Sequence, residues 1–288
     1  MTELFELFRE MLSFTFMQRA LAVGLLVSLC AALLGVNLVL KRYAMIGTGL
    51  SHVGFATMAI AGVVDLTPLS ELIPVDPTLT LTMAVVVFTA FLLLRLNESN
   101  KINGDSAVAL ISTGGIAVGV IVVSMTTGLT LHICNIMFGS IFAMTRADML
   151  FSIGLSVVVV GLFVFFYKQL FAVTYDENFA KATGVRVELY KSLLSILTAV
   201  TVVLGMRMMG ALLIASLTLF PALSAMRVCK RFLSVVITAA VIGVLCFFVG
   251  MMFSFALNLP PGASVVGVNL AVFLIFCIAG LARRGGVA

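Results

Sequence analysis

Long apolar stretches separated by short polar segments dominate the sequence. Nine such stretches occur, at residues 15–40, 44–65, 77–96, 105–126, 149–170, 188–206, 208–228, 232–257 and 263–282. An α-helix rises about 1.5 Å per residue, so about 20 apolar residues cross the roughly 30 Å hydrocarbon core of a bilayer. The pattern therefore predicts an all-α polytopic membrane protein that forms a single domain, residues 1–288.

The number of transmembrane helices depends on the sixth and seventh stretches, which meet at Met206 to Met209. One of the two could be short, broken or re-entrant, which leaves eight or nine spans. Ahead of the first stretch, residues 1–14 are predicted to form an interfacial helix, with a disordered tail as the alternative. Its apolar side would consist of Leu4, Phe5, Phe8, Met11 and Leu12.

The composition agrees with a membrane protein, since 62% of the residues are hydrophobic and only 10% are charged. A net charge of +5 could indicate nucleic acid binding in a soluble protein, but here the basic residues flank apolar stretches and act as topology signals. With the N-terminus outside and nine spans, thirteen of the seventeen Lys and Arg residues fall inside. We therefore expect a multi-pass protein of the cell (plasma) membrane with a cytoplasmic C-terminus and no nucleic acid partner.

None of the twelve acidic residues falls in the middle of a predicted span. Carriers coupled to protons or sodium generally need an ionisable group inside the membrane. The sequence also lacks the HExxH, GxSxG and GxxxxGK[ST] patterns of metalloproteases, serine hydrolases and P-loop ATPases. The chain is therefore not expected to be an enzyme, and energy for active transport would have to come from a partner.

The inside segment at 171–190 predicts a short helix between two spans. Thr174 and Glu177 have the spacing of a capping box, and Gly184 is placed for a left-handed C-cap. Phe179 and Ala180 would give this helix an apolar side. Such a side favours docking to a partner, whereas a solvated connector is the alternative.

A candidate site begins at the inner end of the second stretch. Helical spacing aligns Met45, Thr48 and His52 in one stripe, which Phe55 and Ala59 continue. An ionisable side chain within a span indicates function, and neutral imidazole binds zinc, manganese, iron and copper ions. The alternative is a structural histidine that is hydrogen-bonded to a neighbour. Further candidates for contact with a metal are Ser51, His132, Cys134 and Asn135.

Four segments together resemble the membrane permeases of zinc/manganese/iron-type ABC importers, the ABC-3 family. They are Leu38–His52, Ile136–Ala143, Tyr175–Gly184 and Gly210–Ala222, in the expected order along nearly the whole chain. The resemblance implies a type II ABC importer-like permease that forms a homodimer in membrane lipid. It also implies two cytoplasmic ATPase subunits and an extracytoplasmic metal-binding protein as partners.

The resemblance assigns residues 174–184 to the coupling helix that enters the ATPase cleft. The coupling residues would be Thr174, Asp176, Glu177, Phe179, Ala180 and Gly184. No cofactor would be permanently bound, and a divalent metal ion, zinc or manganese, would be the transported substrate. Pro221, late in the seventh stretch, either kinks a pore helix or serves ordinary packing.

The chain departs from the family pattern at two positions of the candidate site. Thr48 replaces a common Asp, and Asn135 aligns with a common His. The remaining ligands carry less charge, which would suit zinc or a shifted substrate. A permease for a metal chelate such as a siderophore, haem or cobalamin is therefore kept as the first alternative. A secondary metal carrier and an intramembrane enzyme are the others.

Overall fold

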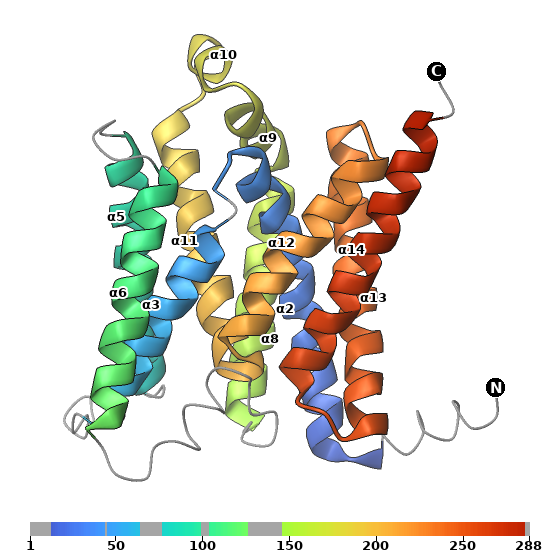
Figure 1. Ribbon diagram of the computed structural model, residues 1–288. Helices are drawn as coiled ribbons and strands as arrows, with labels where there is room; N and C mark the ends of the chain where they lie inside the picture. The colour runs from blue at the N-terminus through green and yellow to red at the C-terminus, as the bar shows by residue number, and fades with distance from the viewer. Residues whose placement is uncertain (1–12, 44, 64–76, 99–103, 126–145, 286–288) are drawn as a thin grey trace.

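The computed structural model describes residues 13–43, 45–63, 77–98, 104–125 and 146–285, and these are folded into helices joined by short turns (Figure 1). The helices are α2 (Thr15–Leu40), α3 (Ile46–Ala61), α5 (Pro77–Glu98), α6 (Gly104–Ser124), α8 (Arg146–Phe165), α9 (Tyr167–Tyr175), α10 (Glu177–Ala182), α11 (Val187–Met209), α12 (Ala211–Val228), α13 (Phe232–Leu257) and α14 (Pro261–Gly285). The predicted interfacial helix at 1–14 lies almost wholly outside the described residues.

Eight of the described helices are long and apolar enough to cross a bilayer, which confirms the polytopic all-α prediction. The short member of the set is α3, whose 16 residues extend only about 24 Å. We expected the sixth or the seventh stretch to be the short or broken one, and this expectation was wrong. α11 and α12 are both long enough to span, and they are separated by Gly210, whose φ of 91° suits a residue without a side chain.

The fifth apolar stretch is also divided differently from the prediction. It contains the end of α8 at Phe165 and then a separate short helix, α9, which begins at Tyr167. α9 and α10 lie at the same end of the bundle as the end of α14, opposite the start of α2 (Figure 1). The first and last described spanning helices thus begin and finish at opposite ends of the bundle.

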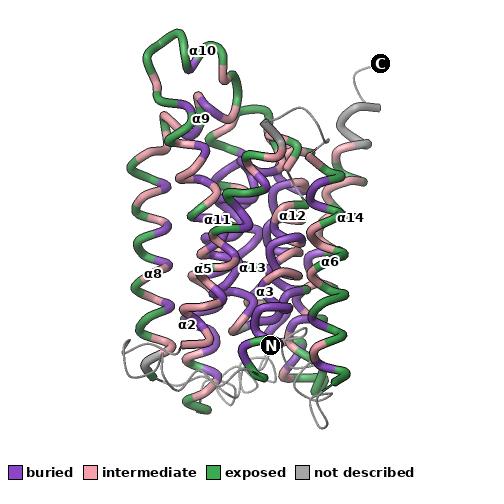
Figure 2. The backbone as a smooth tube through the Cα atoms, turned by 90° about the vertical axis from the view of Figure 1, so that its left-hand side faces the viewer, coloured by how far each residue is buried: buried purple, intermediate pink, exposed green. Residues whose placement is uncertain are grey.

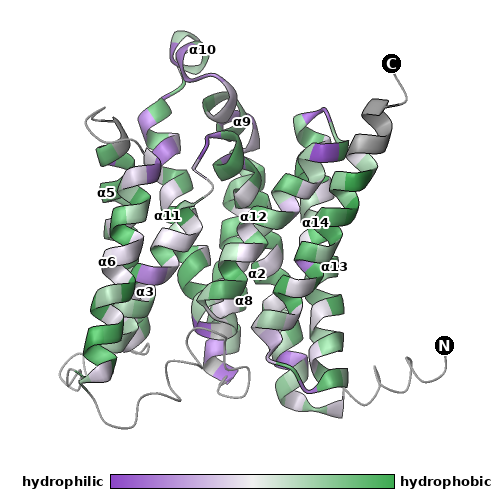
Figure 3. Cartoon of the chain, viewed as in Figure 1, coloured by the Kyte–Doolittle hydropathy of each residue, from purple (hydrophilic) through white to green (hydrophobic). Residues whose placement is uncertain are grey.

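Buried residues are concentrated in the helices at the centre of the bundle, whereas α6, α8 and α14 lie at its periphery (Figure 2). In the apolar segment of α2 that would cross the bilayer, 72% is buried within the protein, whereas in that of α14 only 17% is buried. The exposed side chains of the peripheral helices are nevertheless apolar, as Leu110, Val164 and Ile278 illustrate. Hydrophilic residues gather instead at the helix ends and around α10 (Figure 3). This distribution fits a protein whose sides contact lipid.

Close helix contacts in the core depend on small residues. At Gly35 of α2, an added Cβ would collide with the main chain of Thr218 in α12. Small residues let helix backbones approach within the membrane, where van der Waals packing is the main source of helix association. α2 and α12 therefore pack backbone against backbone at this point.

Replacing Gly35 by alanine should destabilise the bundle by about 1–3 kcal/mol, the usual cost of overpacking. Gly154→Ala in α8 is the matched control, because no atom lies within 4 Å of the position its Cβ would occupy. Thermal unfolding of both purified variants in detergent measures the effect. A Gly35→Ala protein as stable as the wild type would contradict the close contact between α2 and α12.

Candidate functional site

The short helix α3 is enclosed by longer ones. It packs against α5, α6, α11 and α12, and most of its residues are buried. Its first residue, Ile46, follows a turn in which Arg42 takes a left-handed conformation with φ 61°. Because the helix does not need to contact lipid on every side, it can carry polar groups inside the bundle.

His52 lies on the side of α3 that packs against α6. Its Nδ1 shares a hydrogen bond with the Ser112 hydroxyl of α6, and the imidazole tautomer decides which group donates. One turn further along α6, an added Cβ at Gly115 would be 3.0 Å from the His52 carbonyl carbon. Among the described residues, Nε2 has no hydrogen-bond partner. The half-buried ring is therefore oriented through one nitrogen while the other is free to bind.

The rest of the predicted stripe divides into two parts. Met45 is 54% exposed at the start of the helix and Thr48 is half-buried, so both are accessible on the turns that precede His52. Phe55 and Ala59 belong to the core. Ser51 is fully buried and its hydroxyl donates to the Gly47 carbonyl at 2.7 Å, so its polar group is occupied by its own helix.

The other predicted contacts, His132, Cys134 and Asn135, lie outside the described residues and stay predictions. Within the described ranges, no three His, Cys, Asp or Glu side chains are grouped closely enough to hold a metal ion. This part of the chain therefore offers a single imidazole, that of His52, as a candidate metal ligand in α3.

Pro221 lies within α12, is buried, and is followed by further helix as far as Val228. The proline removes one backbone donor from the helix without ending it. Its predicted role as the site of a kink stays a prediction.

α10 is capped at both ends, but not by the predicted residues at its start. The N-cap is Asp176, whose Oδ1 accepts hydrogen bonds from the amides of Asn178 at 2.9 Å and Phe179 at 3.0 Å. The capping box predicted from Thr174 is wrong, because Thr174 belongs to the last turn of α9 and its buried hydroxyl has no partner among the described residues. Glu177 is instead engaged in ion pairs.

The C-terminal prediction for α10 is confirmed. Gly184 has φ 81°, its amide donates to the Lys181 carbonyl, and the next amide, of Val185, donates to the Ala180 carbonyl. These two bonds form a Schellman motif, for which glycine is the favoured residue. A six-residue helix that would be marginal alone is thereby held in a defined shape.

The apolar residues of α10 face in two directions. Ala180 is fully buried and packs in a small cluster with Val173 of α9 and Val187 of α11, so it does not form part of a free apolar side as predicted. Phe179 is 63% exposed and Tyr175 is 81% exposed. Two large aromatic side chains are therefore largely exposed at this end of the bundle, although the Tyr175 ring stacks on that of Phe171 with centroids 5.9 Å apart.

Glu177 joins α10 to two spanning helices. Its carboxylate lies 2.8 Å from the Lys191 ammonium of α11 and 3.1 Å from that of Lys41 at the end of α2. Burial alone would raise the pKa of the Glu177 carboxyl, but the hydrogen bonds from the two lysines outweigh it and hold the pKa below its ordinary value. Burial lowers the pKa of Lys41, and Glu177 opposes that shift.

Comparison with known proteins places the whole chain in one class. The profile of the ABC 3 transport family matches residues 13–280. The manganese transport system membrane protein MntC of Halalkalibacterium halodurans is 26% identical over 275 residues, which are 96% of this chain and 91% of that protein. The high-affinity zinc uptake system membrane protein ZnuB of Haemophilus influenzae is 27% identical over 257 residues, 89% of this chain and 94% of that one.

Among solved structures, PsaBC from Streptococcus pneumoniae in complex with Fab contains a similar chain. The two superimpose with a TM-score of 0.79 at 25% identity and cover 94% of each other. The agreement in sequence and in fold thus extends over nearly the full length of each chain.

Removing the α10 cap should loosen that helix. Asp176→Ala should cost about 1 kcal/mol and so speed amide hydrogen exchange at Asn178 and Phe179 by about fivefold. Thr174→Val should leave exchange unchanged, because the lost hydroxyl has no partner in the described structure. Exchange measured by mass spectrometry on peptides from this segment distinguishes the two. Faster exchange in Thr174→Val, but not in Asp176→Ala, would instead support the predicted capping box at Thr174.

Proposed function

Since the chain belongs to the ABC 3 transport family, and is thus the membrane permease subunit of an importer whose ATP is hydrolysed by separate subunits, we propose that it imports a divalent metal ion, manganese or zinc. The observation that carries the proposal is the family match over residues 13–280. It is supported by relatives named for manganese transport and for zinc uptake, each matched over most of its length.

His52 supplies the chemistry for contact with such an ion. The bond to Ser112 orients the ring, and Nε2 is left for the cargo. Thr48 adds a hydroxyl and Met45 adds a thioether at the accessible start of α3. A pathway must bind an ion strongly enough to admit it and weakly enough to release it, and neutral ligands satisfy the second condition. His132, Cys134 and Asn135 would complete the contacts.

The charge distribution supports an energy source outside the membrane. Among the described residues, the acidic side chains lie at helix ends or in α10, for instance Asp105 and Asp148, and not in the middle of a span. A carboxylate relay for protons or sodium is thus missing from these helices. Transport would instead be driven by contact with the ATPase subunits.

α10 is the proposed site of that contact. Its caps make it rigid, and Phe179 and Tyr175 offer exposed aromatic surface to a partner. The end that carries α10 is also rich in basic residues, which supports its assignment, and that of the C-terminus, to the cytoplasm. These residues include Lys41, Lys181, Arg186, Lys191, Arg227, Lys230 and Arg231. A homodimer of permeases and an extracytoplasmic metal-binding protein at the opposite end complete the proposed importer.

Metal uptake tests the proposal directly. Cells that express the chain with its ATPase and binding protein should accumulate manganese or zinc, and His52→Ala should lower the initial rate about tenfold or more through loss of one ligand. Ser51→Ala is the matched control on the same helix, since its hydroxyl bonds only within α3, and it should retain nearly full uptake.

The panel of ions should include iron and a ferric siderophore. Uptake of the chelate without uptake of any free ion would replace the proposed cargo with a metal chelate. Equal uptake by the His52→Ala and wild-type proteins would remove His52 from the pathway.

A further inference from the structure

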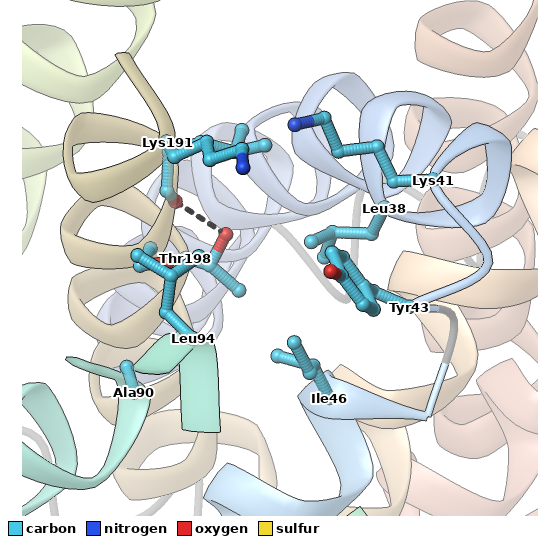
Figure 4. A pocket seen from close by; sticks show the side chains of 10 residues that line it. Leu38, Lys41, Tyr43, Ile46, Ala90, Leu94, Lys191 and Thr198 are labelled. Atoms are coloured by element: carbon cyan, nitrogen blue, oxygen red, sulfur yellow. Dashed lines mark hydrogen bonds between the residues drawn. The ribbon is translucent and has the colours of Figure 1, made fainter. Parts of the chain in front are cut away.

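Two lysines from different spanning helices meet the same carboxylate at the base of α10. Lys41 and Lys191 point toward each other across a small cavity (Figure 4), and Glu177 lies within 3.1 Å and 2.8 Å of their ammonium groups. The lysine side chains are only 6% and 10% exposed, whereas that of Glu177 is 38% exposed. The carboxylate therefore closes the outer side of a largely buried cationic pair.

Both lysines depend on Glu177. Burying an ammonium group is unfavourable unless a partner of opposite charge is within hydrogen-bond distance, and removing such a partner is costly. Glu188 also lies 4.0 Å from Lys191, but its side chain is 63% exposed, so this pair contributes less than that with Glu177. A displacement of Glu177 therefore either draws the two lysines with it or breaks two ion pairs with largely buried ammonium groups.

Lys41 leads directly to the helix that carries His52. It is the C-cap of α2, and the turn that follows places Met45 as the N-cap of α3. Within that turn, the Tyr43 amide donates to the Leu38 carbonyl at 2.8 Å, and Tyr43 lines the cavity together with Lys41 and Ile46, the first residue of α3. Lys41 thus lies only five positions before the first residue of α3 and lines the same cavity, so a shift at Lys41 reaches the start of that helix.

Lys191 makes the second connection. It lies in the second turn of α11, which packs against α3 and α5. Ala90 and Leu94 of α5 and Leu194 of α11 form the opposite wall of the same cavity. Because the cavity lies between the start of α3 and these walls, the first turn of α3 is not close-packed against them (Figure 4).

We propose that Glu177 is a positioning residue that links α10 mechanically to the turn between α2 and α3 and to α11. When the ATPase subunits move α10, the two ion pairs carry the displacement to the entrance of the helix that holds Thr48 and His52. The inference rests on the proposed function, since it assigns a role to the coupling of ATP hydrolysis with transport.

The test uses the complete importer in proteoliposomes and compares metal transported with ATP hydrolysed. Glu177→Gln should still assemble with the ATPase and hydrolyse ATP at a similar rate, but it should transport about tenfold less metal per ATP, a size typical of coupling between sites. Glu188→Gln is the matched control and should behave as wild type. Lys41→Met should add no further loss in the Glu177→Gln background.

The outcomes separate this inference from the proposed function. A wild-type complex without ATP-dependent metal transport would refute the proposed function. A transporting wild type with unchanged metal per ATP in Glu177→Gln would overturn the inference alone. If Glu177→Gln does not assemble, Glu177→Asp decides, because it keeps the charge on a shorter side chain. Reduced metal per ATP in Glu177→Asp supports the inference, whereas an unchanged ratio, or failure of both variants to assemble, overturns it.

Discussion

Burial of α3 inside the bundle is the constraint on which the rest of the structure depends. A helix of 16 residues cannot cross a bilayer unaided, and the irregular chain that precedes it is tolerated at membrane depth only inside protein. The surrounding helices provide that environment. Larger side chains at Gly49 and Gly115 would crowd Val108 and the His52 main chain, so these glycines allow α3 and α6 to pack closely. His52 is accommodated in the bundle because α6 packs against it and the Ser112 hydroxyl of that helix pairs with its Nδ1.

The same arrangement explains how one end of the molecule can influence its middle. α10 is stabilised by Asp176 at its start and by the Schellman motif at Gly184, so it can transmit a displacement without unfolding. Beneath it, the ion pairs of Glu177 lie between α10 and the spanning helices α2 and α11. From there, rigid helices and one short turn lead to His52. The end of α2 and α10, which are more than a hundred residues apart in the chain, are in this way joined through the Glu177 carboxylate.

Apolar length predicted most of the fold because membrane insertion is governed by that property. The bounds of α2 and α13 were predicted to the residue, and His52 was identified as a site candidate from its type and place alone. The length of α3 could not be predicted, since hydropathy records how far an apolar stretch extends but not where the helix within it begins and ends. Thr174 and Glu177 have the spacing of a capping box, but α9 continues through Thr174, so the box does not form. Asp176 is itself a favoured N-cap residue, and its type could have indicated the start of α10.

The ion pairs of Glu177 could not be predicted from spacing. Their partners, Lys41 and Lys191, are brought together only by the packing of α2 and α11. Helical periodicity relates residues three or four positions apart, so contacts between distant helices leave no such trace. The candidate site was thus visible in its residue types, but its connection to α10 was not.

The central claim is that the cargo passes along the α3 face that bears Thr48 and His52. Accessibility of single cysteines in the assembled importer, with the native cysteines replaced, tests it most directly. A water-soluble thiol reagent should modify Thr48→Cys, and manganese or zinc should slow that reaction. Leu50→Cys, on the fully buried side of the same helix, should not react. Equal reactivity at the two positions, or no protection of Thr48→Cys by either ion, would contradict the account.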